Sequence, residues 1–128
     1  MKSDGLLHPE LLRVIGSLGH LDEIVVCDAG LPVPPDPVRI DLAYRPGGPP
    51  FVDVLETIVG EMALESAVAA TEASEELYGS IARAVGNISI ERIAHADFKR
   101  RTAGARAIVR TGEFTPYANV ILVCGVPF

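Results

Sequence analysis

The sequence predicts a single α/β domain over residues 1–128, with helices packed on a mainly parallel sheet. Two observations favour this class. A chain of 128 residues with 48% hydrophobic content suits one compact domain. Along it, short apolar runs alternate with segments whose apolar residues recur at three- and four-residue intervals, which is the order of strands and helices in a parallel sheet.

Four segments are expected to be helical. The first covers residues 9–18, because proline suits the first position of a helix and a glycine follows as a stop. The second covers residues 51–62, where apolar residues form one stripe at helical spacing. The third and fourth are expected at residues 74–85 and at the short basic stretch 97–103.

Six segments are expected to be strands. Residues 23–27 form the clearest one, an apolar run with turn-forming residues on both sides. The others are expected at residues 38–44, 64–71, 88–92, 107–110 and 120–124. The segment 31–37 contains too many prolines for a helix or a central strand, so we expect a stiff extended loop that could wall a pocket.

The charge balance limits the classes of partner. Lys and Arg number 11 against 17 Asp and Glu, a formal net charge of -6, which argues against nucleic acid and against an anionic membrane surface. The chain has neither the ~18 consecutive apolar residues of a spanning helix nor the apolar core of a signal peptide, so we expect a cytoplasmic protein. A mean hydropathy of +0.30 is high for a small chain and predicts apolar surface buried between copies of it.

Several kinds of chemistry find no support. Cys27 and Cys124 lie in apolar runs and are expected to be buried free thiols. The cysteines and histidines lack the close paired spacing of zinc ligands, so no metal is expected. The Gly47-Gly48 pair has neither the P-loop nor the dinucleotide spacing, and no nucleophilic serine motif occurs, so no cofactor is expected either.

His20 and Asp28 flank the strand expected at residues 23–27. Asp28 follows that strand directly, and open α/β sheets bind ligands outside the carboxyl ends of their strands. His20 is a candidate acid/base group, because it could share a cleft with Asp28 at the same edge of the sheet. The alternatives are a surface or capping histidine and a turn-forming aspartate.

The start of the expected fourth helix carries a further candidate, His95. The positive end of the helix dipole disfavours a protonated imidazole there, and a neutral ring can act as a base or as a hydrogen-bond partner. The alternative is a surface residue at the helix entry. The basic run 99–101 is interpreted as a solvated helix face, which could also pair with acidic surface on a neighbouring subunit.

Tyr117 and Asn119 lie in the loop that enters the last strand. In an extended segment, a spacing of two residues puts both side chains on one face. A phenol and an amide on one face suit a hydroxyl-rich ligand. The alternative is a core-anchoring tyrosine beside a turn asparagine.

Taken together, these segments resemble the D-ribose pyranase family, which is related to the fucose mutarotases. The resemblance covers nearly the whole chain. It rests on Leu18-Gly19-His20 with Asp22, Val25-Val26-Cys27-Asp28-Ala29-Gly30-Leu31-Pro32, Arg39-Ile40-Asp41, Glu61-Met62, His95 with Phe98-Lys99, Arg110-Thr111-Gly112-Glu113 and Pro116-Tyr117-Ala118-Asn119.

The resemblance implies cofactor-independent interconversion of the pyranose and furanose forms of D-ribose. It further implies a ring-shaped homo-oligomer, a decamer or an octamer, with active sites between subunits. It places a proton donor at His20 and substrate contacts at Asp28, His95, Tyr117 and Asn119. Gly30, at a position where similar mutarotases tend to carry a histidine, favours ribose over fucose, as does the presence of His95.

Three other functions stay open at this point. A mutarotase acting on fucose or another sugar would share the fold and His20. A non-catalytic sugar-binding module would bind ribose without changing its interconversion rate. A purely structural oligomer subunit would show no rise in melting temperature with a sugar, because nothing would bind the native state.

Overall fold

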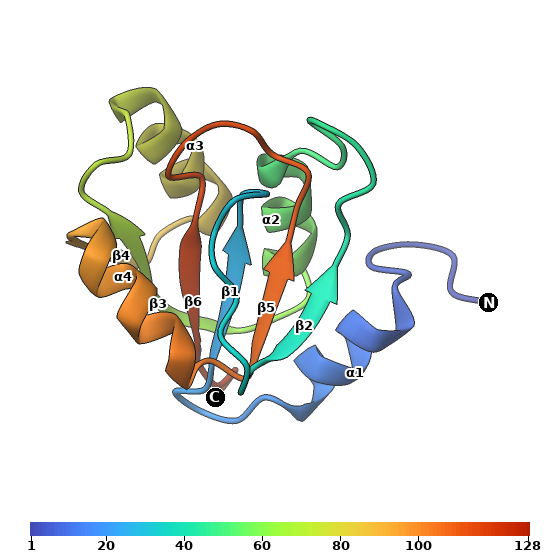
Figure 1. Cartoon of the computed structure of the whole chain (residues 1–128). Helices are drawn as coiled ribbons and strands as arrows, with labels where there is room; N and C mark the ends of the chain where they lie inside the picture. Colours follow the sequence, from blue (N-terminus) through green and yellow to red (C-terminus); the bar gives the residue numbers. More distant parts are fainter.

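A six-stranded sheet with helices on both faces organises the computed structural model, which covers residues 1–128 (Figure 1). The helices are α1 (Pro9–Ser17), α2 (Phe51–Val59), α3 (Glu75–Val85), α4 (His95–Arg101) and the single turn η1 (Thr102–Gly104). The strands are β1 (Glu23–Cys27), β2 (Val38–Asp41), β3 (Leu64–Ala70), β4 (Ser89–Ile93), β5 (Ala107–Arg110) and β6 (Val120–Cys124). None of these helices is both long enough and apolar enough to cross a membrane.

The strands follow the spatial order β2-β5-β1-β6-β3-β4. β2, β5 and β1 are parallel neighbours, and so are β3 and β4. β6 lies between the two groups and is antiparallel to β1 and to β3. The prediction of a mainly parallel sheet is confirmed, and one reversed strand near its centre turns out to matter for the site.

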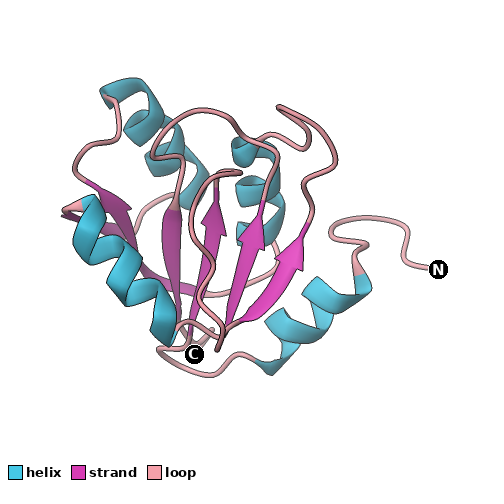
Figure 2. Ribbon diagram, in the orientation of Figure 1, coloured by secondary structure: helices cyan, strands magenta, loops and turns pink.

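Both faces of the sheet are covered (Figure 2). Alternate residues of β1 point into different clusters: Ile24 and Val26 pack with residues of α1, α2 and α3, whereas Val25 and Cys27 pack with Phe98 of α4. A strand buried on both faces needs a continuous apolar run, and this is why its sequence is so readily recognised.

The sequence predicted the elements better than their ends. β1, β5 and β6 have the predicted bounds, but β2 ends at Asp41, because the Asp41 carboxylate accepts a hydrogen bond from Ala43 N and Tyr44 N then bonds Gly48 O in a turn. α2 ends at Val59 rather than at residue 62. α4 begins at His95 rather than at Asp97, because a carboxylate remote in sequence caps it, as described below.

Candidate active site

Asp28 stands at the carboxyl edge of the sheet, directly after β1. Its Oδ1 accepts hydrogen bonds from Gly30 N and Leu31 N, both at 2.9 Å. This is the local turn by which aspartate reverses a chain, so the turn-forming interpretation of Asp28 is correct for one oxygen. The other oxygen, Oδ2, has a different partner.

That partner is Asn119, whose side chain is 1% exposed. Its Oδ1 accepts a hydrogen bond from Asp28 N at 2.9 Å, and its Nδ2 donates one to Asp28 Oδ2 at 3.3 Å. The reversed direction of β6 brings them together: Val120 pairs with Val26, so the residue before β6 meets the residues after β1. The structure thus joins two candidate residues, Asp28 and Asn119, that the sequence did not link to each other.

His95 and Tyr117 form the second part of the same edge. Their rings meet edge to face, with centroids 5.0 Å apart, and the Phe98 ring stacks on His95 from 6.3 Å. His95 Nδ1 is buried and has no hydrogen-bond partner. The orientation of this imidazole therefore depends on packing against Tyr117 and Phe98.

The backbone of His95 is fixed from a distant part of the chain. Both carboxylate oxygens of Glu72, in the turn after β3, accept the His95 N–H at 3.0 Å. This hydrogen bond, with a second one from Thr71, keeps the pKa of Glu72 below its usual value. A carboxylate at a helix N-terminus satisfies a free N–H and the helix dipole, and here it starts α4 at the imidazole.

Tyr117 has an unusual backbone conformation for a large side chain, with φ at 64°. The surrounding turn holds it there, because Ala118 N bonds Thr115 O and Asn119 N bonds Tyr117 O. Non-glycine residues in this region of backbone space are uncommon and cluster at functional sites. Tyr117 meets His95 while Asn119 bonds Asp28, so the prediction that both side chains share one face is wrong, because Tyr117 lies in a turn and not in an extended segment.

A cavity of about 460 Å³ opens between these groups. It is lined by Asp28, Gly30, Leu31, Pro32, His95, Lys99, Pro116 and Tyr117. The proline-rich loop supplies Leu31 and Pro32, as expected for a pocket wall. Its volume lies within the range of small-molecule sites, and the carboxylate, phenol and imidazole groups at its border offer partners for hydroxyl groups.

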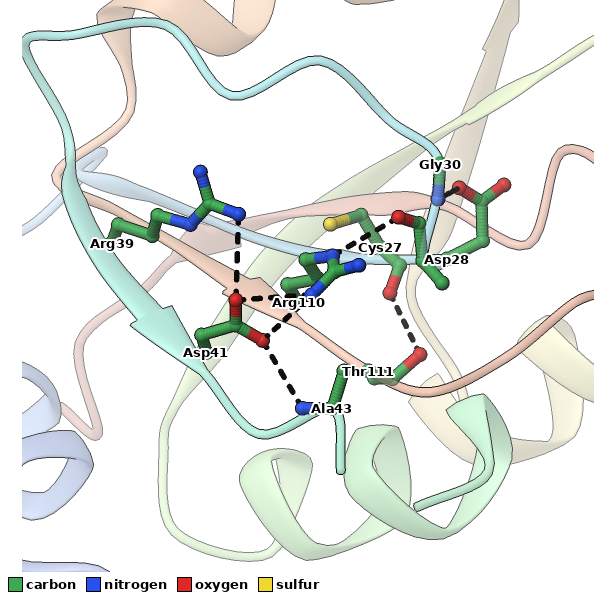
Figure 3. A network of polar contacts seen from close by, with 9 residues as sticks. Cys27, Asp28, Gly30, Arg39, Asp41, Ala43, Arg110 and Thr111 are labelled. Atoms are coloured by element: carbon green, nitrogen blue, oxygen red, sulfur yellow. Dashed lines mark hydrogen bonds and ion pairs between the residues drawn. The ribbon is translucent and has the colours of Figure 1, made fainter. Parts of the chain in front are cut away.

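A neighbouring cavity of about 380 Å³ shares Asp28, Gly30 and Pro116 with the first and adds Arg110 and Glu113. Figure 3 shows the Arg110 guanidinium between Asp41 and the segment after Cys27. Its Nε donates to Ala29 O at 3.0 Å, and its Nη1 donates to both Asp41 oxygens at 3.0 and 3.1 Å. Arg110 thus fixes the turn that carries Asp28.

His20 does not join this group within one chain. It precedes β1, whereas Asp28 follows it, so the two residues lie at opposite edges of the sheet, separated by a strand that spans roughly 15 Å. The prediction that they share a cleft at the same edge is wrong for a single protomer, because consecutive loops flanking one strand always face opposite ends. His20 is instead 49% exposed, with Nε2 3.7 Å from Glu65 Oε2.

Lys99 is a residue that sequence reasoning assigned to solvent. The structure places it on the cavity wall, one helical turn after His95. Spacing of four residues on a helix could have revealed this, since it puts both side chains on one face. The other basic residues of this run pair within the chain, Arg100 with Asp97 and Arg101 with Glu23 and Glu91.

Other reactive groups are placed elsewhere. Burial raises the pKa of the Cys27 thiol to about 12, so Cys27 stays protonated and packs as an apolar side chain. His8 caps α1, where its Nδ1 accepts a hydrogen bond from Leu11 N at 3.2 Å. No three His, Cys, Asp or Glu side chains are grouped to hold a metal ion.

Comparison with known proteins adds the family context. A model of the RbsD / FucU transport protein family matches residues 1–127. The chain is 52% identical over 130 residues to a D-ribose pyranase of Paracidovorax citrulli, with all of both chains covered. It is 45% identical to a D-ribose pyranase of Geobacillus kaustophilus, over all of this chain and 96% of that protein.

Two solved structures bear on the ligand. The structure of Bacillus subtilis RbsD complexed with D-ribose is 43% identical, covers all of both chains and gives a TM-score of 0.94. A fucose mutarotase from Streptococcus pneumoniae, in complex with L-fucose, is 27% identical over 94% of each chain and gives a TM-score of 0.74. Identity and fold are both nearer to the ribose protein.

Proposed function

The chain belongs to the RbsD / FucU transport protein family, and from that premise we propose that it interconverts the pyranose and furanose forms of D-ribose. The observation that carries the proposal is the full-length match to D-ribose pyranases and to a ribose complex, in a chain whose polar groups converge on one cavity. The chemical class is isomerisation of a sugar.

The reaction needs only proton transfers. One group removes the proton of the anomeric hydroxyl while another delivers a proton to the ring oxygen, so that the bond between the anomeric carbon and the ring oxygen breaks and an aldehyde forms. Attack of a different sugar hydroxyl on that aldehyde, with both proton transfers reversed, closes the other ring. No electrons leave the sugar, and no covalent bond to the protein forms.

The cavity supplies the binding half of this chemistry. Asp28 Oδ2 accepts a hydrogen bond from a sugar hydroxyl while Asn119 holds the carboxylate in place. His95 and Tyr117 offer an imidazole and a phenol on the opposite wall. In this assignment the Asp28, His95 and Tyr117 side chains bind the sugar hydroxyls and select the ring form, and the buried Asn119 contributes by fixing the Asp28 carboxylate.

His20 is the proton donor of the proposal, and it comes from a neighbouring protomer. Its imidazole is half exposed at the amino edge of the sheet, where no cavity is shared with Asp28. A contact that seats the amino edge of one protomer on the carboxyl edge of the next would bring the two together. Such a head-to-tail contact repeats around a closed ring.

Exposed apolar residues support this contact. Leu21, beside His20, is 58% exposed, and Phe128 follows from the same edge at the end of β6. Phe114, in the loop before Tyr117, is 68% exposed at the other edge. Large apolar patches on a small protein mark interaction surfaces. A ring of eight or ten protomers, and a cytoplasmic location, are parts of the proposal that light scattering and cell fractionation test.

Magnetisation-transfer NMR on ribose tests the function directly. We expect the protein to accelerate pyranose–furanose exchange, and His20→Ala to lose ~10²- to 10⁴-fold of that acceleration, the usual worth of a general acid or base. His8→Ala is the matched control, because it removes a loop histidine that caps α1 and does not line the cavity.

The outcomes separate the alternatives. Exchange confined to the anomers of fucose would identify a mutarotase and end the ribose proposal. Saturable ribose binding with an unchanged exchange rate, in wild type and His20→Ala alike, would identify a non-catalytic binding module.

A further inference from the structure

The two loops that build the cavity are joined at Glu113. One loop follows β1 and carries Asp28, and the other, residues 111–119, runs from β5 to β6 and carries Tyr117 and Asn119. Glu113 lies between the cavities and helix α2, and the proposed chemistry leaves it without a role.

The Glu113 side chain ties its loop to α2. Oε1 accepts a hydrogen bond from Phe51 N, the first residue of the helix, at 3.0 Å. Oε2 accepts one from the Thr115 hydroxyl at 2.9 Å. Pro50, the residue that precedes α2, has no side chain that can cap it. Glu113 therefore supplies the missing cap from a point 62 residues away in sequence.

The Glu113 main chain ties the same loop to the Asp28 turn. Glu113 O accepts a hydrogen bond from Ala29 N at 2.9 Å, while Ala29 O is held by Arg110. Glu113 N donates to the Thr111 hydroxyl at 3.2 Å, and that hydroxyl donates to Cys27 O at 2.8 Å, a contact drawn in Figure 3. Both sides of the Asp28 turn thus depend on where Glu113 sits.

The neighbouring Gly112 shows how tightly this junction is packed. A Cβ at this position would overlap the main chain of Gly48 and of Arg45. Gly112 N donates to Pro49 O at 2.9 Å, and Gly112 O accepts from Gly47 N at 2.7 Å. The segment before α2 therefore packs tightly against the junction. Glu113 has no free space to move into at this point.

We propose that Glu113 is a positioning residue for the sugar site, which holds the loop of Tyr117 and Asn119 and the turn of Asp28 in register by anchoring both to α2. The inference rests on the proposed function. It differs from an acid/base role, because a positioning residue needs hydrogen-bond capacity rather than a titrating carboxylate.

Two substitutions separate these roles. Glu113→Gln keeps an acceptor for Phe51 N and can donate its amide to Thr115, so it preserves both contacts without the charge. Glu113→Ala removes both. Glu61→Ala is the matched control: Glu61 Oε1 accepts a hydrogen bond from Leu6 N at 2.9 Å beyond the other end of α2, so the same kind of contact is lost away from the cavity.

For Glu113→Ala we expect kcat/KM for ribose exchange to fall by about 10- to 100-fold, the range found when a supporting contact of a site is removed. We also expect KM to rise clearly. Glu113→Gln should stay within about two- to fivefold of wild type, the worth of one charge at a helix N-terminus. Glu61→Ala should match wild type. A decrease in folded protein alone would lower the apparent kcat and leave KM unchanged.

Hydrogen–deuterium exchange gives a second readout that needs no activity. The amides of Ala118 and Asn119 are bonded within the loop, and we expect Glu113→Ala to expose them faster while Glu61→Ala leaves them protected. Equal protection in the two variants would overturn the inference. So would a Glu113→Gln variant as inactive as Glu113→Ala, which would indicate acid/base action. If the wild-type protein does not accelerate ribose exchange, the proposed function is wrong. The amide protection would still test whether Glu113 positions the loop of Tyr117 and Asn119.

Discussion

The two edges of the sheet are built differently. At the carboxyl edge, Asp28, Asn119, His95 and Tyr117 arrive from three separate connections and lock together through hydrogen bonds and ring contacts. At the amino edge, His20 stands half exposed, with one carboxylate at 3.7 Å. One edge is organised before any ligand arrives, and the other presents a single reactive side chain to its surroundings.

This difference suggests a division of labour between protomers. Preorganised groups fix a ligand precisely, since their own positions cost little to maintain on binding. An isolated imidazole gains the same precision only when another surface closes over it. The exposed Leu21 beside His20, and Phe114 near Tyr117, are suited to that closure.

The largest expected effect is the recovery of activity when two inactive variants, one damaged at each edge, are mixed. His20→Ala damages only the amino edge and Asp28→Asn only the carboxyl edge, so each alone should lose ~10²-fold or more of ribose exchange. After unfolding and refolding together, about a quarter of head-to-tail contacts in an equal mixture join two intact edges, and activity should return in proportion.

The control for this mixture is each variant refolded alone. If the mixture stays as inactive as its components, although native mass spectrometry shows oligomers that contain both variants, the site is not shared between protomers. The division between the edges would then be wrong.

A smaller effect is expected from the organised edge itself. Asn119→Ala removes the acceptor of Asp28 N and the donor to Asp28 Oδ2, so KM for ribose should rise and kcat/KM should fall by about 10- to 100-fold. The partly buried Asp28 N–H loses its partner, which should also cost about 1 kcal/mol of stability. NMR exchange and thermal unfolding measure the two effects, and a variant with wild-type KM would contradict the assignment.

Lys99 sharpens the boundary of the organised edge. Lys99 lines the cavity, and loss of a hydrogen bond from a charged group to a sugar hydroxyl would reduce ribose affinity about tenfold or somewhat more. Lys99→Gln should therefore raise the dissociation constant in calorimetry. Arg100→Gln is the matched control, because Arg100 pairs with Asp97 outside the cavity. Equal ribose affinity of both variants would show that Lys99 does not contact the sugar and belongs to the solvated helix face.

The smallest effect concerns acid stability at the carboxyl edge. Burial tends to raise the pKa of Asp41, but hydrogen bonds from Arg110 and Ala43 outweigh it and leave that pKa below its ordinary value. The native state then binds fewer protons than the unfolded state, so this stabilisation is complete above the ordinary pKa of an aspartate and is lost as pH falls through the native value.

Because Asp41 is largely exposed, we expect a loss of less than about 1 kcal/mol from this group. Urea unfolding measured from about pH 6 to about pH 3 should show the free energy of unfolding of the wild type decreasing in the acid range. The same quantity should depend less on pH for Asp41→Asn. Identical slopes for the two proteins would show that the Arg110 pair does not contribute to this dependence.

The sequence by itself identified most of the elements and the residue types of the site. The apolar run at residues 24–27 is readily recognised, because a strand buried on both faces needs a nearly continuous apolar sequence. Asp28 and the pair Tyr117 and Asn119 were found because they adjoin such strands. The structure brings these residues and His95 to one edge.

What local sequence could not provide were contacts between distant segments. The antiparallel direction of β6 places Asn119 against Asp28, and Glu72 starts α4 at His95 from 23 residues away. Neither follows from periodicity, which reports the environment of a residue and not its partner. The sheet also separates His20 from Asp28, since a strand carries its two flanking loops to opposite ends. The local sequence thus determines the chemistry of each residue. Strand order and direction decide which groups meet, because these alone fix distances across the sheet.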